Sequence, residues 1–373
     1  MSYQWPLDPR DLFTERYPQM VNTGLSADDV DAVRAATVEM WPDRPGGWVH
    51  EWSELGARYA AEGRHDLAVL AYGWAKFPVL ADDAKRLAFT RQLAQYELSS
   101  PGFPVSFDRW VLELPYEGET TSVPVNLLSA PGLPAQAPVL LVSGGVDSWK
   151  LDLHLLFVGL ALSTGARVMA FDIPGTGESQ IPLSPSATQI VDGLIAAART
   201  LGDGTVAHLG ISMGGYFSAY TGLAGLVDLA VVLGGPVEAS FAADRRWEFG
   251  MADIVGNTLW LDHSPDADEL GAMMRTLSLR PLLDQDINAP MLVVNGADDV
   301  HVPQHDTLVF EGRRDTRVEL LPDTGHCATT KLGEVVPLMA TWIKETFPPA
   351  RGGSWGAGGL AEEGSGVYLS AAP

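Results

Sequence analysis

The sequence predicts an α/β fold, a mostly parallel eight-stranded sheet with helices on both faces, preceded by a region made of helices alone. Two observations support this prediction. Residues 26 to about 100 follow helical periods, and from Phe107 onward short strand-like runs alternate with helical stretches. Such alternation is typical of a mostly parallel sheet covered by helices. With 373 residues, the chain is long enough for one large domain and a smaller one.

The helical region begins with clear capping chemistry. Ser26 is a favourable N-cap residue, and Asp28 and Asp29 follow it in the first turn. Three further helical stretches are separated by Gly63 and Pro78, namely Trp48–Ala61, His65–Phe77 and Asp82–Leu98. Their apolar side chains form a stripe that packing between helices explains better than a ligand surface does. We therefore expect residues 1–104 to form an N-terminal helical region.

The strand pattern begins with a hairpin. Phe107–Leu114 and Ser122–Leu128 alternate like strands, with Tyr116-Glu117-Gly118 as the turn between them. Six further runs predict the other strands: Pro138–Val142, Arg167–Phe171, Val206–Leu209, Leu229–Leu233, Met291–Val294 and Arg317–Leu321. The hairpin is expected to form the antiparallel edge of the sheet, within a second domain over residues 105–347.

Two segments lack strand character. Residues 236–288 carry scattered Trp, Phe and Met side chains and are expected above the C-terminal ends of the strands, where active sites of open α/β folds lie. We predict a small lid there, with an ordinary pair of surface helices as the alternative. Residues 348–373 are rich in glycine and cannot bury a core, which predicts a flexible C-terminal tail.

The most informative motif is Gly210-Ile211-Ser212-Met213-Gly214, which follows a predicted strand and precedes a predicted helix. In that context G-x-S-x-G indicates a nucleophile elbow, a tight strained turn that projects the serine hydroxyl above the sheet. A bare G-x-S-x-G also occurs in ordinary glycine-rich turns. Later residues must therefore decide between the two interpretations.

An acid and a histidine follow in the order that a catalytic triad of this type requires. Asp298 and Asp299 come after one strand, and His326 comes after the next. A serine hydroxyl needs an imidazole to take its proton, and the imidazole needs a carboxylate to fix its tautomer. We therefore predict that Ser212 is the nucleophile and His326 the base, with one of the two aspartates as the orienting acid.

Acyl transfer also needs hydrogen-bond donors aimed at the oxygen that becomes negative. One predicted donor is the backbone N–H of Met213, next to the nucleophile. The other is expected from the loop Ser143–Lys150, where two glycines free the backbone to turn its amides inward. Gly145 and Val146 are both candidates for this second donor, and the sequence does not separate them.

A resemblance to a known family indicates which of the two aspartates is the acid. Gly296-Ala297-Asp298-Asp299-Val300-His301-Val302-Pro303 is similar to the G-x-x-D-x-x-V-P pattern that members of the α/β-hydrolase superfamily often carry after this strand. The resemblance implies that Asp299 is the acid and that Asp298 helps to shape the turn. It also implies the α/β-hydrolase fold for the sheet domain, which makes residues 105–347 the catalytic domain.

Further motifs narrow the resemblance to one branch. The stretches Gly144–Lys150 and Phe171–Ser179, the elbow, and Gly325-His326-Cys327 resemble a branch that includes fermentation–respiration-switch-type proteins, 2,6-dihydroxypseudooxynicotine hydrolase and fungal pigment polyketide hydrolases. Its members carry an N-terminal helical cap, which implies that role for residues 1–104. The nicotine enzyme also uses a cap-region glutamate, for which Glu238 and Glu248 are the candidates here.

The resemblance implies several reactions. Branch members cleave esters or the C–C bonds of 1,3-dicarbonyl-like compounds, so we expect a hydrolase that acts on a small, apolar carbonyl compound of secondary metabolism. One alternative is an acyl-eliminating lyase that uses the same three residues, as in related tetronate and other polyketide pathways, where some enzymes eliminate acetate. A second alternative is an acyltransferase. A non-catalytic binding protein is the fourth hypothesis.

Composition limits the partners. The net charge of −23 and the pI near 4.5 argue against nucleic acid or an anionic membrane surface, because phosphates would be repelled. No nicotinamide or flavin fingerprint is present, and His301 and His305 lack the glutamate of a zinc-binding H-E-x-x-H helix, so we expect no cofactor and no metal.

Cysteine usage and hydropathy suggest a compartment. Cys327 is the only cysteine, so no internal disulfide can form. We find no signal-peptide pattern and no apolar run of membrane-spanning length, which predicts a cytoplasmic protein. The expected partner is a small-molecule substrate. The oligomeric state stays open, with a homodimer among the possibilities.

Overall fold

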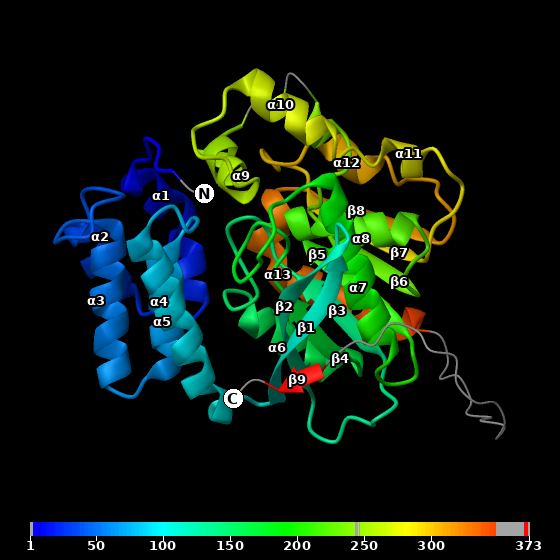
Figure 1. The fold of residues 1–373 in the computed structure, drawn as a ribbon, viewed down its shortest axis with the longest axis horizontal. Coiled ribbons are helices and arrows are strands. Elements are labelled where there is room, and N and C mark those ends of the chain that lie inside the picture. Colours follow the sequence, from blue (N-terminus) through cyan, green and yellow to red (C-terminus); the bar gives the residue numbers. More distant parts are fainter. Residues whose placement is uncertain (1–2, 243–244, 246, 348–368, 372–373) are drawn as a thin grey trace.

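The computed structural model describes residues 3–242, 245, 247–347 and 369–371. A group of helices formed by the first hundred residues lies beside an α/β domain (Figure 1). The helices of this N-terminal region are α1 (Pro9–Asn22), α2 (Ala27–Ala36), α3 (Trp48–Ala61), α4 (His65–Lys76) and α5 (Asp83–Ser99).

The predicted N-terminal helices are present, and one more precedes them. The side chain of Ser26 accepts the N–H of Asp29 at 3.1 Å, as expected for an N-cap. Helix α1 was not predicted, because few of its side chains are apolar and Pro18 interrupts its pattern.

Aromatic side chains fill the centre of the helical region. Phe13 of α1 packs against Trp48 of α3, with ring centroids 4.8 Å apart, and Trp48 lies 5.9 Å from Trp52. Trp48 and Trp52 are fully buried, so these side chains contribute core packing, as the apolar stripe predicted.

Lys85 of α5 is also fully buried and donates to the carbonyls of Ala75 and Phe77, and burial lowers its pKa to about 7.

All eight predicted strands and one further short strand, β9, form one sheet, in the order β8-β7-β6-β5-β3-β4-β2-β1-β9. The strands are β1 (Ser106–Tyr116), β2 (Glu119–Ser129), β3 (Val139–Ser143), β4 (Arg167–Phe171), β5 (Val206–Ile211), β6 (Leu229–Leu233), β7 (Met291–Gly296), β8 (Thr316–Leu321) and β9 (Leu369–Ala371). Strands β3 to β8 are parallel, and the β1–β2 hairpin is antiparallel. Glu117 and Gly118 both have positive φ, as a tight hairpin turn requires.

The short strand β9 was not predicted. It pairs antiparallel with β1, with Trp110 opposite Ala371. The hairpin therefore lies near the edge of the sheet, and β9 forms the outermost strand. The rest of the predicted flexible tail, residues 348–368 and 372–373, lies outside the described residues.

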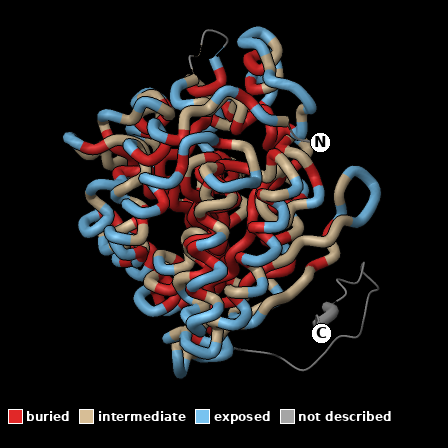
Figure 2. Tube along the Cα trace, turned by 90° about the vertical axis from the view of Figure 1, so that its left-hand side faces the viewer, coloured by how far each residue is buried: buried red, intermediate tan, exposed pale blue. Residues whose placement is uncertain are grey.

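Helices cover both faces of the sheet, and the burial follows this layering. Helices α6 (His154–Thr164) and α13 (Leu332–Thr346) pack on one face, against residues such as Leu140. Helices α7 (Thr188–Arg199) and α8 (Met213–Leu223) pack on the other face, against residues such as Leu141. Neighbouring residues of β3 therefore serve opposite layers, and the buried residues concentrate in the interior of the molecule (Figure 2).

The segment between β6 and β7 contains helices and no strand in its described part, as predicted. Its helices are α9 (Met251–Thr258), α10 (Ala267–Arg275) and α11 (Arg280–Leu283). The buried carboxylate of Asp306, in α12 (Gln304–Leu308), anchors the start of this segment by accepting the backbone N–H groups of Glu238, Ala239 and Ser240. In Figure 1, α9 and α10 run along the top of the molecule.

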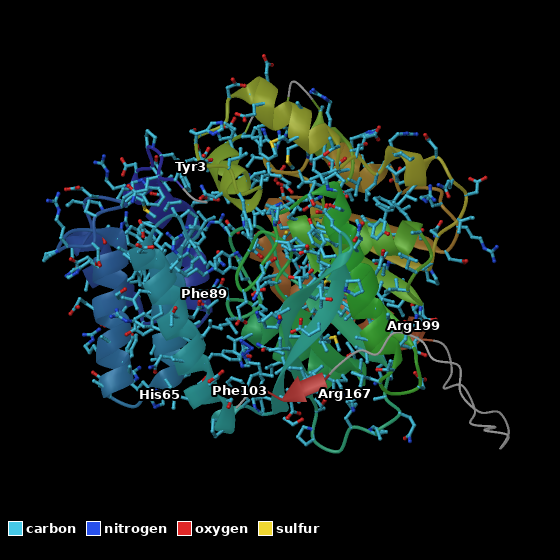
Figure 3. The ribbon with its side chains drawn as sticks, in the orientation of Figure 1. Tyr3, His65, Phe89, Phe103, Arg167 and Arg199 are labelled. Carbon is cyan, nitrogen blue, oxygen red and sulfur yellow. The ribbon has the colours of Figure 1, made fainter. Side chains whose placement is uncertain are left out.

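The N-terminal segment ties this region to the helices. The hydroxyl of Tyr3 donates to the carbonyl of Asp253 in α9 at 3.1 Å, and Figure 3 shows Tyr3 at the side of the helical region that faces α9. Trp5 is buried, and its carbonyl accepts the indole N–H of Trp41 at 2.6 Å. The first residues of the chain therefore contact both covering parts of the molecule. Within the described residues, no helix has the length and apolar character needed to cross a membrane.

Candidate active site

Ser212 occupies a strained turn between β5 and α8. Its φ of 56° and ψ of −125° place a non-glycine residue in a sparsely populated region, as expected for a nucleophile elbow. The turn is closed by the N–H of Gly215, which donates to the Ser212 carbonyl at 2.7 Å. A Cβ at Gly210 would lie 1.9 Å from the carbonyl oxygen of Gly214, so the strand and helix can meet this closely only with glycine there.

The structure brings the three predicted catalytic side chains together. Nε2 of His326 lies 2.9 Å from Oγ of Ser212, and Nδ1 lies 2.7 Å from Oδ2 of Asp299. Asp299 follows β7 and His326 follows β8, so both loops meet the elbow at the C-terminal edge of the sheet. Asp298 is exposed, and its N–H donates to the carbonyl of Thr324, which gives it a place in the turn.

Four hydrogen bonds hold the carboxylate of Asp299, whose side chain is fully buried. Besides the His326 contact, Oδ1 accepts the N–H groups of His301 at 2.7 Å and Val302 at 3.0 Å, and Oδ2 accepts the amide of Asn295 at 2.8 Å. Burial favours the neutral acid, but the donors around the carboxylate outweigh it and hold the pKa of Asp299 below its usual value. The carboxylate is therefore charged and can orient the imidazole.

Asn295 was not predicted from the sequence. It lies in β7, and besides its contact with Asp299 its side-chain oxygen accepts the backbone N–H of Cys327 at 3.0 Å. One amide thus links the acid loop to the residue that follows His326. The only sequence signal is its position four residues before Asp299, and no motif marks it as functional. Cys327 itself is a buried free thiol.

The groups around His326 favour the protonated form of its imidazole. Burial alone lowers the pKa of His326, but the adjacent Cys327 side chain and the Asp299 carboxylate override it, and the pKa is raised well above 6.5. The side chain of His326 is 24% exposed, so the ring can still be reached from outside. An imidazole held in this way can take the proton of Ser212 and keep it while charge develops on a substrate.

The geometry separates the two candidates for the second oxyanion donor. The N–H of Gly145 donates to the carbonyl of Ser148 at 3.0 Å, which closes the loop on itself. Within the described residues, the N–H groups of Val146 and Met213 have no hydrogen-bond acceptor. Val146 and Met213 therefore each have an amide N–H free to bind an oxyanion, and Gly145 provides the close approach of the loop to Ser212.

The last residue of the loop Ser143–Lys150 belongs to a buried cluster of charged side chains. Lys150 is fully buried, and its ammonium lies 2.5 Å from Asp172 and 2.7 Å from Glu178. Burial lowers the pKa of Lys150, but the two carboxylates outweigh it and raise it. The Asp172 carboxylate also fills the turn of Gly175–Ser179, since a Cβ at Gly177 would lie 2.1 Å from its oxygen. The sequence of this turn resembles a phosphate-binding loop, but the Asp172 carboxylate occupies the turn.

The N-terminal helical region contacts the loop that carries Val146. Lys76 of α4 is buried, and its ammonium lies 2.6 Å from Asp152 and 3.5 Å from the ring centroid of Trp149. Arg16 of α1 lies 2.9 Å from Asp147. A pocket is present at this junction, lined by residues of both parts: Gln19, Thr23, Leu70, Gly73, Trp74, Phe77, Asp147, Ser148 and Asp152.

Helix α1 also reaches the acid side of the site. Glu15 lies 3.8 Å from Nε2 of His301, and the His301 ring packs edge-on against His326, with ring centroids 5.3 Å apart. Neither residue was predicted as functional; His301 was considered only as a metal ligand, in a motif that lacks the required glutamate.

The two glutamates considered as cap-region candidates have other surroundings: Glu238 lies 3.1 Å from Arg280, and Glu248 is exposed. In the described part of the chain, no cluster of three or more His, Cys, Asp or Glu side chains could hold a metal ion.

A family model described as the alpha/beta hydrolase fold matches residues 137–281, which include the loop Ser143–Lys150 and the elbow. The chain has the α/β-hydrolase fold. Its sheet order, its strained elbow serine and the helices on both faces all agree with this fold.

Relatives of this hydrolase-fold enzyme include two curated proteins of related length. It is 23% identical over 308 residues to esterase FrsA of Photobacterium profundum, a match that covers 75% of this chain and 72% of the relative. It is 24% identical over 303 residues to hydrolase LUC6 of a Fusarium species, covering 65% and 72%. The FrsA relatives support the branch that the sequence motifs suggested.

Two solved structures share the fold over nearly the whole chain. The crystal structure of 2,6-dihydroxy-pseudo-oxynicotine hydrolase superposes with a TM-score of 0.73 and 19% identity, covering 89% of this chain and 95% of that one. Wild-type AbyA5 superposes with a TM-score of 0.71 and 20% identity, covering 89% and 98%. At this coverage, the shared fold extends into the N-terminal helical region.

Proposed function

We propose that this protein is a serine hydrolase that cleaves an ester or a C–C bond of a small, apolar carbonyl compound of secondary metabolism. The observation that supports this most strongly is the unbroken hydrogen-bond chain from Ser212 through His326 to Asp299, with distances of 2.9 and 2.7 Å. This arrangement lies at a strained elbow with two unoccupied backbone amides beside it. A nucleophile, a base, an orienting acid and an oxyanion site are the complete set for acyl transfer.

The reaction follows from the geometry. Oγ of Ser212 attacks the carbonyl carbon while its proton passes to Nε2 of His326, and the imidazolium is stabilised by Asp299. The carbonyl oxygen becomes negative and accepts hydrogen bonds from the N–H groups of Val146 and Met213. The leaving group departs with its electron pair and takes up a proton, and His326 gives up the proton of Ser212 and becomes neutral again. Water, deprotonated by His326, then attacks the acyl-serine and releases the acid.

The substrate class is inferred from the surroundings of the site and from the names of the relatives. The two curated relatives are named as an esterase and a hydrolase, which supports a carbonyl substrate. In the pocket at the junction with the helical region, Trp74 and Phe77 offer apolar area beside polar side chains such as Asp147, and none of the triad residues line this pocket. We propose that the N-terminal helices act as a cap and that residues 236–288 act as a lid, because both reach the edge of the sheet where Ser212 lies.

The experiment measures turnover of short aryl acetates by the wild type, Ser212→Ala and His326→Ala. Hydrolysis by the wild type, with a loss of about 10⁴-fold or more in either variant, is the expected result. Because an aryl acetate has no β-hydrogen to lose, elimination is tested with a β-acetoxy ketone. Acetate release with alkene formation that persists in Ser212→Ala but not in His326→Ala would instead support elimination with His326 as the base. Trapping of the acyl group by an added alcohol in preference to water would support acyl transfer.

A further inference from the structure

We propose that His301, paired with Glu15 of the N-terminal helical region, is a second proton donor of this site that serves the leaving group. The proposal rests on the proposed function, because it assigns a step of acyl transfer at Ser212. It gives the helical region a chemical role in addition to covering the site.

His301 is placed against the triad by its backbone. Its N–H donates to Oδ1 of Asp299 at 2.7 Å, which fixes the start of its side chain on the acid loop. Its ring lies edge-on to the His326 ring, with a centroid distance of 5.3 Å and an angle of 79° between the rings. The imidazole of His301 therefore lies beside the base that receives the proton of Ser212.

Segments that are far apart in the sequence converge on this side chain. Glu15 of α1 places Oε1 at 3.8 Å from Nε2 of His301, and the ring of Phe249, from the segment before α9, lies 6.0 Å away on centroids. Arg245 donates to the His301 carbonyl at 2.5 Å. The side chain is only 10% exposed, so His301 lies in the interface between the catalytic edge and the parts that cover it.

The pairing suits proton transfer. A carboxylate near one nitrogen of an imidazole orients the ring, as Asp299 does for His326 on the other side of the site. Glu15 is itself held by Arg16, whose guanidinium lies 3.5 Å from it. The ion-pair contact of the His301 ring with Glu15 uses Nε2, and Nδ1 has no hydrogen-bond partner within the described residues. We assign this free nitrogen to the substrate.

The proton transfer from His301 accompanies the loss of the leaving group. The bond between the acyl carbon and the leaving atom breaks, and the electron pair moves to the leaving atom. A proton passes from Nδ1 of protonated His301 to that atom, which leaves a neutral imidazole with Glu15 beside Nε2. His326 releases the proton of Ser212 to solvent before deacylation, and solvent returns a proton to His301. The net reaction consumes one water and releases the acid and the protonated leaving group.

A leaving-group comparison tests this assignment. Para-nitrophenolate leaves without protonation, whereas the more basic phenolate needs a proton donor. We expect His301→Gln to lower kcat/KM for phenyl acetate by about 10²-fold and to leave para-nitrophenyl acetate within about twofold of the wild type. Glu15→Gln is expected to shift the ratio in the same direction by a smaller factor. His305→Gln, four residues away and 62% exposed, is the matched control and should leave the ratio unchanged.

Folding and the proposed function are checked separately. A fluorophosphonate probe, whose fluoride leaves without a proton, should label Ser212 at similar rates in the wild type and in His301→Gln. Equal losses with both acetates, or no change in their ratio, in a variant that labels normally would overturn the role of His301 alone. Failure of the wild type to label at Ser212 would instead count against the proposed function.

Discussion

The backbone of Gly145 lies directly against the side chain of Ser212. A Cβ at Gly145 would be 2.9 Å from Cβ of Ser212 and 3.0 Å from its Oγ, closer than side chains pack. Only glycine lets this loop come so near, and the next residue, Val146, has the free N–H that we propose as an oxyanion donor. The loop and the nucleophile are therefore fitted to each other at this one position.

Gly145→Ala is expected to impair catalysis more than stability. The added methyl group must push the loop away from Ser212, which weakens the oxyanion site, and we expect kcat to fall by about 10²-fold, the usual effect of losing one donor. Gly159→Ala is the control, because a Cβ there meets nothing within 4 Å. Ester turnover and thermal unfolding of both variants are the measurements. Equal activity in the two variants would contradict the inference that catalysis needs the close approach of the Gly145 backbone to Ser212.

Asp299 and Asp298 are predicted to differ sharply. Asp299→Asn removes the charge that orients His326, and we expect a loss of about 10⁴-fold in kcat. Asp298→Asn changes an exposed side chain and is expected to cost little. Steady-state kinetics of the two variants decide the matter, and a larger loss for Asp298→Asn would reverse the assignment of the acid.

The pH profile follows from the pKa of His326. The imidazole accepts a proton only when neutral, so activity is expected to rise with pH through the pKa of the free enzyme. Because that pKa is raised well above 6.5, the rising limb of kcat/KM should have its midpoint above this value. In Asp299→Asn the carboxylate that raises the pKa is gone, so the residual rate should have its midpoint at lower pH. A midpoint below 6.5 in the wild type would contradict the prediction.

The helical region is predicted to be a cap that cannot be separated from the catalytic domain. The buried Lys76 ammonium on Trp149 and the contact of Arg16 with Asp147 both cross this boundary. We expect residues 1–104 alone to show no cooperative melt and residues 105–347 alone to show no ester turnover. Expression of both fragments tests this. A cooperative melt of the first fragment, together with full activity of the second, would show two independent domains.

The sequence was sufficient to predict the main features of the fold because the strands are continuous apolar runs and each triad residue follows one of them. The elbow glycines, the hairpin turn at Glu117 and the three helices from Trp48 to Ser99 all carry local signals. Strand β9 has only three residues, and its pairing with β1 depends on tertiary contact across the chain.

The parts of the site that could not be predicted depend on contacts between distant residues. Asn295 acts through hydrogen bonds to Asp299 and Cys327, and nothing in its own sequence neighbourhood reveals them. Glu15 contacts His301 from a helix with few apolar residues, 286 positions earlier in the chain. Such pairs become visible only once the fold places them side by side.

Mass spectrometry after reaction with a fluorophosphonate probe determines whether Ser212 is a covalent nucleophile. We expect one adduct per chain on the wild type, mapped to Ser212, and none at that position in Ser212→Ala, which should also lack ester turnover; this is the expected role of Ser212. A folded wild-type protein that carries no adduct on Ser212, or a Ser212→Ala variant that keeps wild-type turnover, would contradict it.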